Sequence, residues 1–242
     1  MSDINNNLEF WESVQTTDPA YAKDAQVGGQ FRTMVDAQYK KKMITKKFGI
    51  YGMGWGVLPE SEIYERIEHP MTMLLVYRAT AFYVVNEKQF TFPIAAAIKE
   101  YYVTKNGAGY AKIDDEAVKK VRTDALTKGF TDLGFNTDIH MGMWEDQDYI
   151  AAINLANEIS TEDDEEKQTA LAQEKISEFM YKQVEFIETI TSETAYVAAM
   201  RNLVPKIRKR CAAAKINSAA FVETLTDLVN EKQNTDNNEG EK

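Results

Sequence analysis

The sequence is poor in the residues that build disulfides and metal centres. Among its 242 residues it has one cysteine, Cys211, and two histidines, His69 and His140. A single cysteine excludes an intramolecular disulfide and a four-cysteine zinc site, and it favours a reducing compartment. Asp138 and His140 are a weak candidate ligand pair, because a lone histidine near a helix end is more often structural. We therefore expect neither a metal nor another cofactor.

Long apolar runs are also missing. No uninterrupted apolar stretch is long enough for a membrane span, and residues 1–7 lack a basic segment followed by an apolar one. The hydrophobic content of 44% is enough for one substantial core with a helical extension. We expect an unsecreted, cytoplasmic protein without a membrane partner.

Motifs for nucleotide chemistry are absent as well. The phosphate loop G-x-x-x-x-G-K-[ST] does not occur, and the glycines between Gly52 and Gly56 lack its spacing. Asp114, Asp115 and Glu116 resemble a two-metal nuclease cluster, but acids at the positive end of a helix explain them more simply. We expect a protein that is not an enzyme.

Positive charge is scarce overall and concentrated locally. Lys and Arg number 28 against 38 Asp and Glu, which gives a net charge of -10 and excludes nucleic-acid binding through overall attraction. Binding would need local patches, and the largest holds five lysines between Lys40 and Lys47. This patch is either a solvated surface or a set of phosphate contacts. A second basic run, Arg201 to Lys215, contains no acid. It could bind DNA, a neighbouring subunit or the acidic tail of the chain.

The first half of the chain predicts a helix, a group of strands and a second helix. Apolar residues mixed with charge predict a helix over about 30–47, with Gly49 as its C-cap. β-branched and aromatic residues over 51–104 predict three or four antiparallel strands, with a hairpin turn at 86–88. A second helix is expected from about 114 to near Gly134.

Aromatic residues are abundant among the predicted strands. Exposed rings stack on bases in many single-strand-binding proteins, but strand aromatics are more often buried, so we favour core packing. The aromatic residues of the predicted strands are Tyr77, Phe82, Tyr83, Phe90, Phe92, Tyr101 and Tyr102.

The second half predicts helices only. Amphipathic patterns run over 147–159 and 163–232, with breaks expected near Ser192, Pro205 and Asn217. Residues 234–242 are too polar to offset the entropy of ordering, so we predict a disordered tail. The resulting class is α+β, with a core over 1–146, a helical region over 147–233 and the tail.

Several short motifs follow one another in a fixed order. Gly28-Gly29-Gln30 lies eighteen residues before Phe48-Gly49, and Gly54-Trp55-Gly56 follows. The segment Val121 to Phe135, with Thr123-Asp124 inside it, completes the set. This ordered set resembles the Rad fifty-two family of single-strand annealing proteins and its phage relatives. The resemblance covers roughly residues 10 to 145.

The resemblance implies a fold and an activity. It implies an N-terminal helix and a β-β-β-α annealing-protein core, a homo-oligomeric ring, and a cationic groove that binds single-stranded DNA. Complementary strands would be annealed in homologous recombination without ATP, in the cytoplasm of a bacterium or of a phage-infected host cell. Expected partners are single-stranded DNA, further copies of the chain, and either a host single-strand-binding protein or a phage exonuclease. The alternatives are a passive single-strand coating protein, an oligomeric protein-binding scaffold and a metal-dependent nuclease.

The family's DNA-contacting positions match this sequence only in part. A basic position falls on Asp24, beside Lys23, and an aromatic one on Met34. An adjacent basic pair falls on Thr127 and Lys128, and a third basic position on Thr131. The outer DNA site falls near Lys88. With nearby cations as substitutes, the predicted DNA-binding residues are Lys23, Arg32, Lys40, Lys41, Lys42, Lys88, Arg122 and Lys128.

Overall fold

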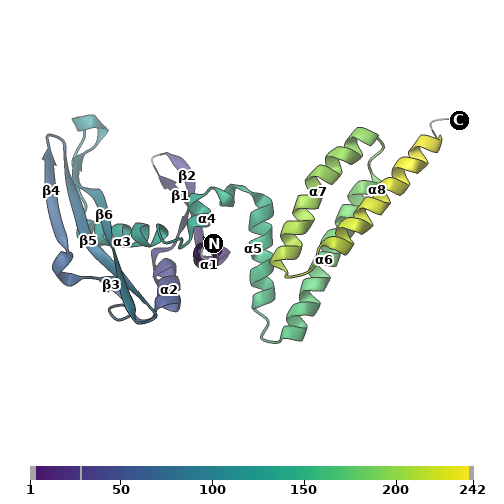
Figure 1. The fold of residues 1–242 in the computed structure, drawn as a ribbon. Coiled ribbons are helices and arrows are strands. Elements are labelled where there is room, and N and C mark those ends of the chain that lie inside the picture. The colour runs from purple at the N-terminus through teal and green to yellow at the C-terminus, as the bar shows by residue number, and fades with distance from the viewer. Residues whose placement is uncertain (1–3, 28, 240–242) are drawn as a thin grey trace. The chain divides into compact units, whose positions relative to one another are not determined.

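The computed structural model describes residues 4–27 and 29–239, which divide into two compact units (Figure 1). The first unit holds the chain up to Thr17 and Tyr21–Met141; the second holds Asp18–Ala20 and the chain from Gly142. Helices and antiparallel strands mix in the first unit, and the second is helical. The predicted α+β class is therefore confirmed.

A five-stranded antiparallel sheet forms the centre of the first unit. Its path is β3-β5-β6-β7, and β4 pairs with β5 beyond the short β3. Asn86 and Glu87 join β5 to β6 with φ of 50° and 62°, the left-handed backbone that a two-residue hairpin turn requires. This confirms the strands and the turn predicted between 51 and 104. The strands are β3 (Trp55–Val57), β4 (Ile63–His69), β5 (Thr72–Val85), β6 (Lys88–Val103) and β7 (Ala111–Ile113).

Helix α3, Ala117–Thr131, covers one face of this sheet and confirms the second predicted helix. Val121 and Phe130 are fully buried in the same core as Leu75 and Tyr77 of β5. Gly129 lets the helix approach β6, because a Cβ there would collide with the Ile94 side chain. The apolar stripe of α3 thus fixes which of its faces turns away from the sheet.

The first predicted helix is wrong in its N-terminal part. Gln30–Val35 forms strand β2, which pairs with β1 (Ala22–Val27) in a hairpin, and helix α2 covers only Ala37–Phe48. Asp36 ends the strand and caps the helix, since its carboxylate accepts from the backbone N–H of Gln38 and Tyr39. The predicted C-cap, Gly49, is confirmed with φ of 97°.

A buried polar cluster joins the end of α1 (Ile4–Gln15) to the start of α4 (Thr137–His140). Asp138 accepts from the Thr17 hydroxyl at 2.6 Å and from the Thr17 backbone N–H at 2.7 Å. Asn136 donates to the same hydroxyl at 3.1 Å, and all three side chains are inaccessible to solvent. These bonds link segments about 120 residues apart in sequence.

The second unit packs four helices around its own core. Helix α7 runs through Pro205, so the break predicted there is wrong: proline removes one helical hydrogen bond, and Leu203 and Ile207 on either side are held in the core. Cys211 is buried in this core, and burial raises the pKa of its thiol. The helices are α5 (Gln147–Ser160), α6 (Glu165–Glu188), α7 (Glu193–Ala213) and α8 (Ala219–Glu239).

The breaks predicted near Ser192 and Asn217 coincide with helix ends, whereas the disordered tail predicted from residue 234 does not. Ser192 caps α7, and the Asn217 side chain accepts from Ala219 at the start of α8. Helix α8 continues to Glu239, which replaces the predicted disorder over 234–239; residues 240–242 lie outside the described residues. Within the described chain, none of the helices is both long and apolar enough to cross a membrane.

Candidate functional site

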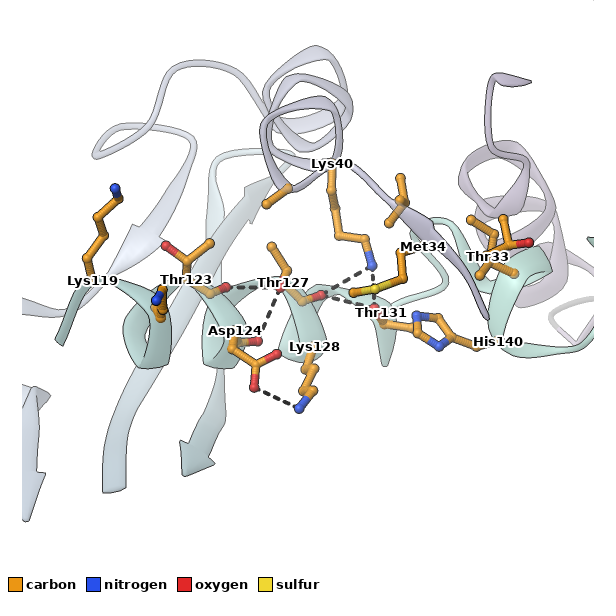
Figure 2. A pocket seen from close by; sticks show the side chains of 14 residues that line it. Thr33, Met34, Lys40, Lys119, Thr123, Asp124, Thr127, Lys128, Thr131 and His140 are labelled. Carbon is orange, nitrogen blue, oxygen red and sulfur yellow. Dashed lines mark hydrogen bonds and ion pairs between the residues drawn. The ribbon is translucent and has the colours of Figure 1, made fainter. Parts of the chain in front are cut away.

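A pocket of about 350 Å³ lies between α3 and the segment that joins β2 to α2 (Figure 2). Met34, Val35 and Ala37 line it from that segment, and His140 lines it from the end of α4. Lys40 reaches down from α2 toward α3, as Figure 2 shows. The pocket therefore brings together residues that are about 90 positions apart in the chain.

Two parallel rows of side chains on α3 form one wall of the pocket. Lys119, Thr123, Thr127 and Thr131 follow one another at intervals of four, and Lys120, Asp124 and Lys128 form the adjacent row. Residues four apart lie on the same helical face, so both rows point away from the sheet that α3 covers. The wall extends along most of the helix.

The lysines of this wall are exposed, and each pairs with a carboxylate of the same region. Lys119, Lys120 and Lys128 have side chains exposed by 76%, 50% and 67%, and their amino groups lie 2.7 to 2.8 Å from the carboxylates of Glu116, Asp114 and Asp124. Exposed ion pairs contribute roughly 0 to 1 kcal/mol, so an incoming phosphate can replace these acids as the partner. We call these three lysines the rim.

Lys40, one of the predicted DNA-binding residues, is buried. Its side chain is 2% exposed, and its Nζ donates to Thr131 Oγ1 at 2.6 Å and to the Thr127 carbonyl at 3.4 Å. Removal from water lowers its pKa to about 8, although the negative charges of Asp138 and Asp132 oppose this shift. Lys40 therefore places an ammonium inside the pocket rather than on its surface.

Replacing Lys40 by methionine should raise the stability of the first unit by about 1 to 2 kcal/mol at pH 7, because a buried charge is costly and methionine has a similar length. In the native chain the unfolded state binds more protons than the folded state between about pH 8 and pH 10.5. Native stability should therefore rise with pH across this window, and the advantage of the variant should shrink. Urea unfolding at pH 7 and pH 10 measures both effects. Lys46→Met, on the exposed side of α2, is the control, and a less stable Lys40→Met protein at pH 7 would contradict the prediction.

Neither a scan against protein-family models nor a search of curated proteins finds a match to this chain.

Arg122, another of the predicted DNA-binding residues, has a structural partner. Its guanidinium donates to Glu62 at 2.8 Å and 3.3 Å and to the Tyr51 hydroxyl at 3.1 Å. Glu62 also accepts from the hydroxyl of the buried Tyr77. The hydrogen bond from Arg122 keeps the pKa of the Glu62 carboxyl low, which is the behaviour of a stable ion pair. Arg122 lies outside the pocket lining and holds α3 to the chain before β4.

The other predicted DNA-binding residues are spread over the first unit. Lys23 and Arg32 are exposed on the β1-β2 hairpin, where Lys23 is the register partner of Met34 and approaches Asp36 at 3.5 Å. Lys42 is exposed, and its Nζ lies 5.7 Å from the centre of the Tyr21 ring. None of these three residues, nor Lys41 or Lys88, lines the pocket.

Lys41 and Lys88 differ in their surroundings. Lys41 is half-buried, and both desolvation and the nearby charge of Arg122 lower its pKa. Lys88 is exposed at the start of β6, beside the β5-β6 turn. Lys119 and Lys120 were not among the predicted DNA-binding residues, although both line the pocket together with Lys128.

The predicted strand aromatics are mostly core residues. Tyr77 and Phe82 are buried, and Tyr83 and Phe92 pack partly buried against the same core, whereas Phe90 is 46% exposed. Outside these strands, Phe31 on the β1-β2 hairpin is 80% exposed.

No metal centre is found among the described residues, where no group of three potential ligands comes together. Asp138 is occupied by Thr17, and His140 lies in the pocket lining. Partial burial, with the positive charges of Lys40 and Lys128, lowers the pKa of His140 and favours the neutral ring at pH 7.

The second basic run lies on α7 and the turn after it. Lys206 and Lys209 pair with Asp148 and Asp146 at the start of α5. The Arg210 guanidinium lies over the Phe179 ring at 4.1 Å. Half of this run therefore serves packing within the helical unit.

Proposed function

We propose that the chain binds single-stranded DNA along the lysine-bearing side of α3 and anneals complementary strands without ATP. The observation that carries this proposal is the pocket itself. Four of the six positions selected by the resemblance to the annealing family line one hollow although they come from two distant segments: Met34, Thr127, Lys128 and Thr131. Asp24 and Lys88 lie outside its lining. Three exposed lysines lie on the same wall, which supplies the local positive charge that an acidic chain needs for this activity.

The strand order also supports an annealing-protein core. β4, β5 and β6 are consecutive antiparallel neighbours, and α3 then packs on their sheet, which fits a β-β-β-α arrangement. Phosphate contacts reduce the repulsion between two strands and leave the base edges free to pair. Base pairing, rather than the protein, then supplies the sequence specificity.

Annealing is the direct test of this proposal. Two complementary labelled oligonucleotides mixed with the protein, with chelator present and nucleotide absent, should form duplex faster than they do alone. A passive coating protein would bind the strands and slow this reaction, and a scaffold would leave the rate unchanged. Equal or slower annealing in the presence of bound protein would therefore reject the proposal.

We further propose that the first unit self-associates through its sheet. Every residue of the edge strand β4 is exposed, and Ile63 and Ile67 expose 58% and 46% of their surface. The cross-strand register places Ala95 and Ala97 on the same side of the sheet, which is opposite α3, and both are exposed. Uncovered edges and apolar sheet faces favour association with further copies.

Oligomers should be visible by light scattering at micromolar protein. Ile63→Lys combined with Ile67→Lys should shift the mass toward a monomer, because charges on the face oppose its burial. Val197→Lys, at a 61% exposed position of α7, is the matched control. A native monomer at this concentration would contradict self-association.

A further inference from the structure

The interior of the pocket differs from its rim. Its lining includes the apolar side chains of Met34, Val35 and Ile139, together with threonines, Asp124 and His140. A volume of about 350 Å³ is at the low end of small-molecule sites, which typically measure roughly 300 to 1,000 Å³. Phosphates bound at the rim would leave this apolar interior unused.

Lys40 gives the pocket a buried cationic anchor. An ammonium has three N–H donors, and Thr131 Oγ1 and the Thr127 carbonyl accept two of them. Among the described residues, Lys40 has no carboxylate within ion-pair distance of Nζ, unlike each rim lysine. A buried cation with spare donor capacity is stabilised by an additional oxygen acceptor.

We propose that the pocket takes one unstacked nucleobase from a strand held at the rim, with Lys40 Nζ donating to a carbonyl oxygen of the base. This inference rests on the proposed function. Base-binding pockets combine apolar contacts on the ring faces with hydrogen bonds to the ring edge, which matches apolar side chains beside a buried ammonium. Unstacking costs little in a strand that is already single. Thymine, guanine and cytosine carry a carbonyl oxygen and adenine does not, so the pocket disfavours adenine.

A base held in this way has a consequence for annealing. It cannot pair while it occupies the pocket, so it anchors the strand at one point and leaves the neighbouring bases available. Pairing would begin in the intervals between anchored bases. The rim supplies binding that is independent of sequence, and the pocket adds a preference for particular bases.

The test compares strands that differ only in their bases. One is an oligothymidine, the second carries difluorotoluene, which keeps the shape of thymine but lacks its carbonyl groups, and the third is abasic. Native protein should bind the thymine strand about ten- to a hundredfold more tightly than the difluorotoluene strand, the value of one hydrogen bond to a charged donor. The abasic strand should bind more weakly still. Fluorescence anisotropy at a fixed salt concentration measures all three affinities.

Variants of α2 identify the donor. In Lys40→Met, which is expected to fold with higher stability, the preference for thymine over difluorotoluene should fall below about twofold. Lys46→Met should keep the native preference. Equal native binding of thymine and abasic strands, or a thymine preference that survives in Lys40→Met, would overturn the pocket while leaving phosphate binding intact. Failure to bind any of the strands would instead reject the proposed function, and the pocket with it.

Discussion

Replacing Lys119, Lys120 and Lys128 together by glutamine should weaken single-strand binding about a hundredfold at roughly 0.1 M salt. Each phosphate contact to a single strand contributes a slope of about 0.7 in the dependence of log affinity on log salt. Three lost contacts should reduce that slope by about 2, and at 0.1 M salt the same loss amounts to about two decades of affinity. Titration of a labelled oligonucleotide at several salt concentrations gives both quantities.

The control separates local contacts from total charge. Lys167, Lys182 and Lys232 belong to the helical unit, and their combined replacement by glutamine changes the net charge of the chain by the same amount. Its salt slope should remain native. If the rim variant kept the native slope, or if both triple variants lost the same affinity, the rim would be an ordinary solvated surface.

Asp138→Ala should destabilise the first unit by about 3 to 5 kcal/mol. The Asp138 carboxylate accepts hydrogen bonds from the Thr17 hydroxyl, the Thr17 backbone N–H and, at 2.9 Å, the Ile139 backbone N–H. Its removal leaves these donors without an acceptor at a site that solvent does not reach. Each buried unsatisfied group costs about 1 to 3 kcal/mol. The loss is a large part of the stability of a typical domain, and urea unfolding followed by tryptophan fluorescence measures it.

Two further variants make this prediction specific. Thr17→Val keeps the backbone N–H that donates to Asp138 and should cost less than Asp138→Ala. Asp132→Ala removes an exposed acid from the turn after α3 and should change the stability by less than about 0.5 kcal/mol. An Asp138→Ala protein within 1 kcal/mol of the native one would show that water replaces the carboxylate.

Local patterns were sufficient to predict α3 and the β5-β6 hairpin. The apolar stripe through Val121 and Phe130 has helical spacing and therefore predicts a helix. Asn86 tolerates the left-handed backbone of a tight turn. The β1-β2 hairpin was missed because Phe31, Met34 and Val35 also fit helical spacing over so short a segment. Only pairing with Ala22–Val27, which is a tertiary contact, decides between the two.

The candidate site could be predicted only in outline. Lys40 precedes Ile44 and Phe48 at intervals of four, and these three residues form the buried side of α2. That spacing is a signal in the sequence that Lys40 differs from its neighbours Lys41 and Lys42. No comparable signal exists for Arg122, because its partner Glu62 lies 60 positions away and is brought to it only by the fold.

The burial of Cys211 makes the chain well suited to site-specific labelling. Its side chain is 1% exposed, and the raised pKa of its thiol keeps it protonated and unreactive near neutral pH. A dye coupled to a cysteine introduced on the β1-β2 hairpin would therefore report on DNA at the first unit without a background signal. The rate at which a thiol reagent modifies Cys211 would measure how often the helical bundle opens. The reagent reaches that sulfur only when α7 leaves its neighbours.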